Sequence, residues 1–142
     1  MASFHDHHID RVTIDALAAV IRLDTSLEAN GARLVGIAEF TGVAAYHFAG
    51  DAFGTILDDL AETDPFALYE AFAEEIQASW RATGGHASWV HALPEARAFI
   101  TANPLRGFEI ISSVGMVGAI WCRAFSGVVH EVVTPSITQR GP

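Results

Sequence analysis

Apolar and β-branched residues alternate with polar residues through most of the N-terminal half of the chain, which is the pattern of half-buried strands. Residues 8–15 (HIDRVTID) and 17–27 (LAAVIRLDTSL) predict two strands that a short connection around Asp15 joins. The alternation shifts between Ile9 and Val12, and a shift of this kind predicts a β-bulge.

Turn-forming residues separate these strands from the next ones. Asn30-Gly31 is a dipeptide typical of two-residue hairpin turns, so we expect a third strand after it. Residues 33–50 are long enough for two strands, or for one strand bent at Gly42, because glycine inside a strand pattern marks a bulge or a change of direction. A short strand within 54–58 (GTILD) would complete a first antiparallel meander.

The pattern changes from strand to helix at Asp64. Asp64 is a suitable N-cap, and Pro65 is a suitable first helical residue. Apolar side chains then recur at spacings of three and four residues: Phe66, Tyr69, Ala73, Ile76 and Trp80. We therefore expect a helix that packs on the sheet through this stripe and ends at Gly84-Gly85, where glycine can adopt the left-handed conformation.

A second, shorter helix is predicted at about 94–102, because Pro104 disfavours the helical conformation at Asn103. Residues 108–129 then return to the sheet as two strands with a turn near Gly115.

These elements together predict an α+β fold, in which two helices pack on an antiparallel, meander-like sheet of five or more strands. At 142 residues, 51% of them hydrophobic, the chain is long enough to bury a core without disulfides. We expect residues 1–142 to form a single domain, with flexible tails at about 1–5 and 134–142.

The single cysteine, Cys122, excludes an internal disulfide and a cysteine-rich zinc site. Its place in an apolar strand pattern predicts a buried structural thiol. The N-terminus lacks the basic start and apolar segment of a signal peptide, and the longest apolar run, 114–122, is shorter than the roughly 20 residues of a membrane span. We expect a soluble protein of the reducing cytoplasm that does not bind membranes.

Charge narrows the class of partner. The formal net charge is −9, and all 8 basic residues are arginine. Nucleic-acid binding depends on clustered basic residues, so we do not expect it. The acidic residues are concentrated in one stretch without a basic residue, which predicts an acidic face: Asp58, Asp59, Glu62, Asp64, Glu70, Glu74 and Glu75.

The segment SFHDHHID, residues 3–10, is the densest group of metal-ligating side chains. If it is extended, His5 and His7 lie on one face, where they could share a divalent metal with a distant ligand such as His47. A metal site needs three or four ligands and groups that orient them, and no zinc-binding motif is present. We therefore predict a structural role, with a metal site at these three histidines as the alternative.

No motif for nucleophilic catalysis or phosphate binding is present, so the sequence predicts no catalytic residue and no cofactor, and favours a non-enzyme. Trp89 lies between His86 and His91, and two interpretations stay open for it. It is either part of an exposed binding surface or folded back over the edge of the core.

Three short motifs carry a resemblance over roughly the first 60 residues: FHD at 4–6, FTGV at 40–43 and FGTILD at 53–58. In these motifs the chain resembles a group of small bacterial proteins of unknown function, some of which look like immunity proteins of toxin systems. The resemblance implies an antiparallel sheet carrying helices, and binding in preference to catalysis.

Three functional hypotheses follow. The first is an interaction module that presents an acidic face to a basic protein partner through Asp58, Asp59, Glu62, Glu70, Glu74, Glu75 and Trp89. The alternative is a small-molecule-binding protein or enzyme with a pocket between sheet and helix, whose polar groups are His5, Asp6, Tyr46 and His47. The third is a homodimer paired through an exposed sheet edge or face. An apolar pocket with convergent polar groups would favour the second hypothesis, and a flat acidic face would favour the first.

Overall fold

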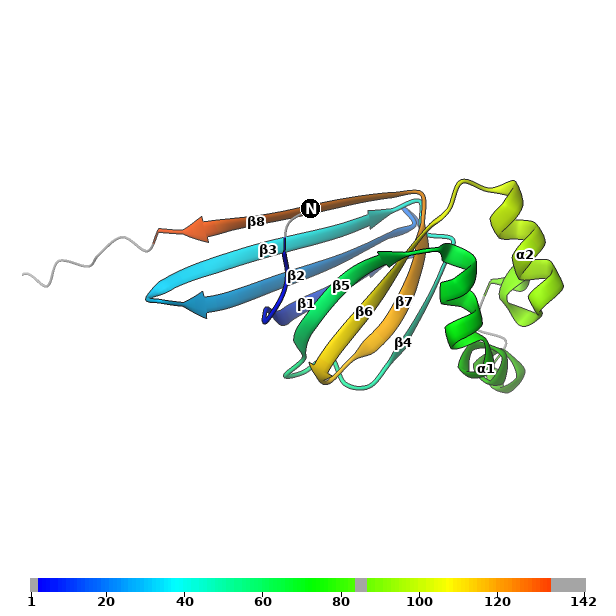
Figure 1. The fold of residues 1–142 in the computed structure, drawn as a ribbon, viewed down its shortest axis with the longest axis horizontal. Coiled ribbons are helices and arrows are strands. Elements are labelled where there is room, and N and C mark those ends of the chain that lie inside the picture. The colour runs from blue at the N-terminus through cyan, green and yellow to red at the C-terminus, as the bar shows by residue number, and fades with distance from the viewer. Residues whose placement is uncertain (1–2, 84–86, 134–142) are drawn as a thin grey trace, which may run out of the picture.

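The computed structural model describes residues 3–83 and 87–133. These residues form an eight-stranded antiparallel sheet with two α-helices, which confirms the predicted α+β class (Figure 1). The order across the sheet is β4-β7-β6-β5-β1-β2-β3-β8. The elements are β1 (His8–Asp15), β2 (Val20–Ala29), β3 (Ala32–Thr41), β4 (Ala45–Ala49), β5 (Ile56–Thr63), α1 (Pro65–Thr83), the 3-10 turn η1 (Ser88–His91), α2 (Leu93–Ala102), β6 (Arg106–Val114), β7 (Val117–Cys122) and β8 (Ala124–Val132).

Local turn chemistry accounts for the first half of the sheet. Asn30 and Gly31 have positive φ angles of 53° and 78°, as a type I′ hairpin requires. The register of β1 against β2 shifts between Ile9 and Arg11, which confirms the predicted bulge. Gly42, with φ of 61°, separates β3 from β4, so the segment 33–50 forms two strands.

The last part of the sheet differs from the prediction of two strands. The turn at Gly115 is present, but a second break at Arg123 divides the segment into β6, β7 and β8. The Arg123 N–H donates to the carbonyl groups of Thr41 and Gly42, at 3.0 and 3.2 Å. This contact directs the chain away from β7 and along the free edge of β3. The sequence does not reveal the break because apolar alternation continues through it.

The sheet is bent across its middle, where β1 and β5 pair at His8 and Ile56. In Figure 1 the strands β5, β6, β7 and β4 turn across the half formed by β1, β2, β3 and β8. Side chains from the inner faces of both halves meet in the larger core, which contains Phe4, Ile9, Ile21, Leu23, Ala38, Phe40, Leu57, Leu60, Phe108, Ile110, Met116, Ile120 and Cys122.

The helices pack on the outer face of the β4–β7 half. β7 is buried on both faces, because Ile120 and Cys122 point into the larger core while Ala119 and Trp121 point toward the helices. The indole N–H of Trp121 donates to the carbonyl of Pro65 at 2.8 Å, which attaches the start of α1 to the sheet.

Helix α1 begins as predicted, with Asp64 Oδ2 accepting a hydrogen bond of 2.8 Å from the Ala67 N–H. Its predicted end at Gly84-Gly85 lies outside the described residues. The apolar stripe is partly as expected, since Tyr69 and Ile76 are buried.

The prediction that Trp80 belongs to the buried stripe is wrong, because its side chain is 37% exposed and does not pack in the core. It lies near the C-terminal end of α1, where its ring stacks on the imidazole of His91 at 5.2 Å between centroids. Leu68, which the predicted stripe did not include, is buried.

The N-terminal residues 3–5 were expected in a flexible tail. In the structure the Phe4 side chain is 3% exposed and belongs to the larger core. The following Asp6 N–H donates to the carbonyl of Leu57 at 2.8 Å, which fixes this segment beside β5. Among the described helices, none combines the length and apolarity needed to cross a membrane.

Candidate functional site

The turn between β1 and β2 is fixed against the start of β4. The Val43 N–H donates to the carbonyl of Ala19 at 2.9 Å, and the Ala44 N–H donates to the carbonyl of Trp121 at 2.8 Å. The entry to β4 is thus attached to the turn on one side and to β7 on the other. Backbone positions held in this way preform the space between them.

A cavity of about 370 Å³ lies in this space, within the size range of small-molecule sites. β4 is an end strand of the described sheet, so its outer edge faces the cavity instead of another strand. The residues that line the cavity come from the end of β1, the β1–β2 turn, the start of β2, β4 with the two residues before it, α1 and the segment before η1: Ile14, Asp15, Ala16, Ala19, Val20, Ile21, Val43, Ala44, Ala45, Tyr46, His47, Phe48, Ser79 and Ala87.

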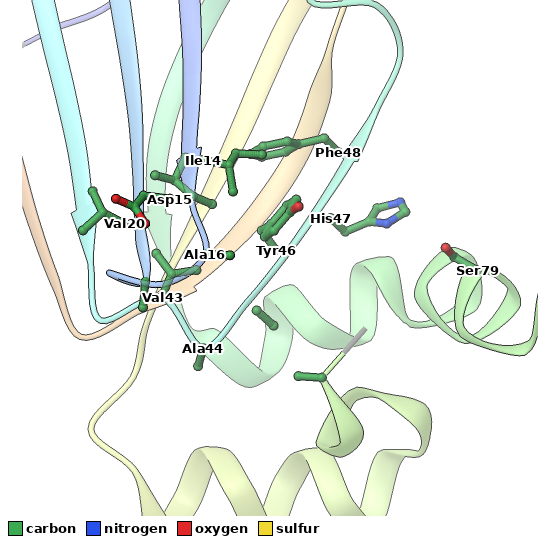
Figure 2. Close-up of a pocket in the computed structure, with 14 residues that line it drawn as sticks. Ile14, Asp15, Ala16, Val20, Val43, Ala44, Tyr46, His47, Phe48 and Ser79 are labelled. Atoms are coloured by element: carbon green, nitrogen blue, oxygen red, sulfur yellow. The ribbon is translucent and has the colours of Figure 1, made fainter. Parts of the chain in front are cut away.

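The apolar part of the cavity contains solvent-exposed side chains. Ile14 is 44% exposed and Tyr46 is 38% exposed. Figure 2 shows Tyr46 and Phe48 on the side of β4 that faces Ile14. The two aromatic rings are tilted against each other with centroids 5.0 Å apart. Apolar surface in a concave site is typical of a place that a ligand covers.

Polar groups lie around this apolar part. His47 points to the opposite side of β4, toward the helix that carries Ser79 (Figure 2). Its ring contacts Phe72 of α1 at 6.1 Å between centroids. At the other end, Asp15 Oδ1 accepts a hydrogen bond of 2.9 Å from the Ala18 N–H, which orders the β1–β2 turn. The cavity therefore combines apolar side chains with polar groups, as ligand sites do.

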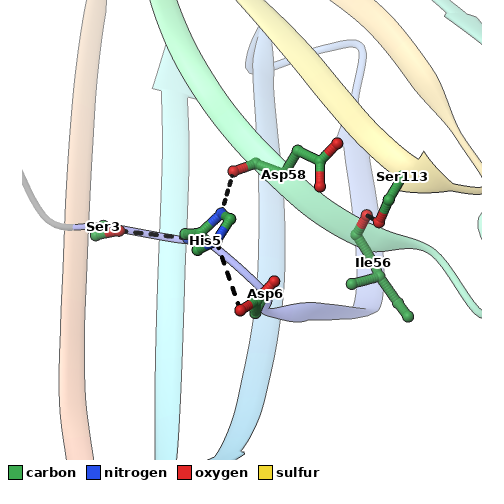
Figure 3. A network of polar contacts seen from close by, with 6 residues as sticks. All are labelled: Ser3, His5, Asp6, Ile56, Asp58 and Ser113. Carbon is green, nitrogen blue, oxygen red and sulfur yellow. Dashed lines mark hydrogen bonds and ion pairs between the residues drawn. The ribbon is translucent and has the colours of Figure 1, made fainter.

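The two other residues predicted for a pocket, His5 and Asp6, do not line this cavity. They lie beside β5, where His5 Nδ1 donates to the carbonyl of Asp58 at 2.7 Å and Nε2 lies 3.5 Å from Asp6 Oδ2 (Figure 3). The Asp58 carbonyl, followed by the Asp6 carboxylate, raises the pKa of His5 above its ordinary value. The structure thus brings together Tyr46 and His47 and leaves the other pair elsewhere.

The metal alternative needed His5, His7 and His47 to converge. A turn at His5-Asp6, with φ of 65° at Asp6, replaces the extended conformation on which that arrangement depended. His7 enters the core and is hydrogen-bonded to Thr25, whereas the His5 ring is exposed. Among the described residues, no three histidine, cysteine or acidic side chains lie close enough to share a metal ion.

The acidic residues of the predicted partner surface lie on β5 and α1, and all of them are exposed: Asp58, Asp59, Glu62, Glu70, Glu74 and Glu75. Glu62 accepts two hydrogen bonds of 2.8 Å from Arg106, and the guanidinium lowers the pKa of this carboxyl group. A basic residue distant in the sequence therefore neutralises one member of the stretch.

Trp89, the aromatic member of that surface, is 7% exposed and stacks on Phe99 at 4.7 Å. It covers the helix-side core, which was the alternative interpretation of its position. His86 lies outside the described residues. Cys122 is fully buried at the end of β7, where burial raises the pKa of its thiol to about 11.

Sequence reasoning missed Ile14, Phe48 and Ser79 of the cavity. The sequence of the β1–β2 turn could have indicated the cavity. It is Ala16-Leu17-Ala18-Ala19, whereas polar residues and glycine usually predominate in turns. Leu17 at this turn is 100% exposed. Ser79 carries no such mark, since its position depends on how α1 packs.

Comparisons with known proteins do not assign a family. No family model matches the chain, and neither the curated proteins nor the solved structures gave a match. The site is therefore interpreted from its own geometry.

Proposed function

We propose that the protein binds a compact, largely apolar small molecule in the cavity between the β1–β2 turn and β4. The observation that carries the proposal is the cavity of about 370 Å³, into which Ile14 and Tyr46 expose apolar surface. Burial of such surface favours binding by roughly 25 cal/mol per Å².

Preorganisation supports the proposal. The hydrogen bonds from Val43 to Ala19 and from Ala44 to Trp121 hold the cavity walls in place without a ligand. A ligand that enters a preformed site loses less free energy to ordering the protein. The acidic-partner hypothesis stays a prediction of the sequence. Two residues of its surface are less available than expected, because Trp89 is buried and Glu62 is paired with Arg106.

The test uses N-phenyl-1-naphthylamine, an uncharged dye that fluoresces in apolar surroundings. Ala16 lines the cavity and Ala18, in the same turn, does not, and both are exposed. Ala16→Trp should fill the cavity mouth and weaken dye binding by about tenfold or more, the effect of losing about 1.4 kcal/mol. Ala18→Trp, the matched control, should bind the dye within about twofold of the parent chain.

Two results would overturn the proposal. One is a parent chain that does not bind the dye at concentrations up to its solubility limit. The other is equal binding by the two tryptophan variants, which would place the dye on a different surface.

A further inference from the structure

The charge pattern of the cavity is one-sided. Among the described residues that line it, Asp15 is the one carboxylic acid, and neither arginine nor lysine is present. The chain as a whole has a formal net charge of −9 and no lysine. A ligand with a negative charge would meet the Asp15 carboxyl group and no arginine or lysine there, and desolvation of its charge would oppose binding.

The aromatic pair adds a second preference. Tyr46 and Phe48 project from the same side of β4, and their rings are 5.0 Å apart at a tilt of 43°. The face of an aromatic ring carries partial negative charge and attracts a cation within about 6 Å of its centroid. Neither ring is paired with an arginine in a cation–π contact of the described residues, whereas Phe66 and Phe108 are.

We infer that the cavity selects a ligand with a cationic ammonium group attached to an apolar body. The inference rests on the proposed function, and it assigns the ligand class of the same site. The ammonium group lies against the exposed part of the Tyr46 ring beside Phe48, and the apolar body contacts Ile14. Asp15, in the same lining, supplies a counter-charge at longer range. The acidic surface of the whole chain raises the local concentration of cations and speeds their encounter.

Three probes of similar size test the inference by displacement of N-phenyl-1-naphthylamine at pH 8. They are phenyltrimethylammonium, its uncharged isostere tert-butylbenzene, and the anion benzenesulfonate. All three probes are measured at the same pH, so the protein carries the same charge in each comparison. We expect the cation to bind about tenfold or more tightly than the anion, which is a difference of about 1.4 kcal/mol.

Variants locate the effect. Asp15→Asn keeps an oxygen that can accept from the Ala18 N–H and removes the charge, so it should weaken the cation about fivefold and leave tert-butylbenzene within about twofold. Asp10→Asn removes the same charge from an exposed position on β1 that does not line the cavity, and it should change neither probe beyond about twofold. Tyr46→Leu should weaken the cation more than its uncharged isostere.

The outcomes separate the two proposals. If the cation binds no more tightly than benzenesulfonate, or if Asp15→Asn and Asp10→Asn have the same effect, the cationic ligand class is wrong, while binding of the dye and of tert-butylbenzene still supports the proposed function. If the dye and all three probes fail to bind, the proposed function itself is wrong.

Discussion

The imidazole of His7 is hydrogen-bonded to the hydroxyl group of Thr25, with 2.8 Å between Nδ1 and Oγ1, in the interior of the bent sheet. Both side chains are 1% exposed. The ring of Phe4 lies edge-on against the imidazole at 5.8 Å between centroids. A histidine in such surroundings is stable when neutral, because protonation would place a charge in an apolar site.

This contact predicts a pH dependence of stability. Burial lowers the pKa of His7 below its ordinary value near 6.5. The unfolded chain therefore binds the proton more readily, so the free energy of unfolding is highest above pH 6.5 and falls as the pH drops below it. Each unit of pKa difference corresponds to about 1.4 kcal/mol. Urea unfolding of the parent chain and of His7→Asn at pH 5.5, 6.5 and 7.5 should give a shallower slope in the variant.

Substitution of His5 should change the pH dependence of stability in the opposite direction. Its pKa is raised, so its contribution to stability is present below pH 6.5 and is lost as the pH rises through the folded-state pKa. His5→Asn should therefore steepen the rise in stability with pH over the same range. Parallel slopes for the parent chain and His7→Asn would contradict the assignment of a neutral, buried imidazole.

Gly36 tests the packing around Phe4, His7 and Thr25. A Cβ atom at this position would lie 2.8 Å from Cε1 of Phe4 and would also meet the Thr25 hydroxyl group. Gly36→Ala should lower the free energy of unfolding by about 1–3 kcal/mol, the usual cost of overpacking. If the clash is with Phe4, Gly36→Ala and Phe4→Leu together should cost about 0.5 kcal/mol or more less than the sum of the single losses. Strict additivity in urea melts would exclude this contact as the cause.

Trp89 and Trp80 form a matched pair for the helical layer. Trp89 is 7% exposed and stacks on Phe99, so Trp89→Ala should cost about 3–5 kcal/mol. Trp80 is 37% exposed, and Trp80→Ala should cost about 1–2 kcal/mol. The sequence alone would assign the larger loss to Trp80, because its spacing places it on the apolar stripe. Equal losses in chemical denaturation would show that the helical layer packs differently.

The parts of the fold that follow from local chemistry could be predicted from the sequence. The turn at Asn30-Gly31 and the cap at Asp64 depend on residues next to one another, and both are present. The break at Arg123 could not be predicted, because it depends on carbonyl groups of Thr41 and Gly42 that are distant in the sequence.

The candidate site also contains residues that the sequence predicts and residues that it does not. Tyr46 and His47 are adjacent polar residues in an apolar strand, which makes them visible in the sequence. Ile14 joins them only because the β1–β2 turn is attached to Val43 through Ala19, a tertiary contact without a local pattern. The burial of His7 could not be predicted either. Its polar neighbours predict an exposed segment, but the turn at Asp6 places its side chain in the interior.

Cys122 gives a last prediction, which concerns the most buried part of β7. Its side chain is fully buried, and its thiol has a pKa of about 11. Thiol reagents attack the thiolate, so at pH 8 both burial and protonation protect this residue. Reaction with Ellman's reagent should require transient unfolding and should be at least about a hundredfold slower than in concentrated urea.

A positional control separates burial from the reagent's own limits. Ser126→Cys in a Cys122→Ser background places a thiol at an exposed position of the edge strand β8. This thiol should react with the native protein at nearly the rate seen in urea, because neither burial nor apolar surroundings protect it. Rapid reaction of Cys122 in the native parent chain would mean that the β7–β8 end of the sheet opens readily. In that event the Ala44–Trp121 contact, which fixes β4 beside the cavity, would open with it.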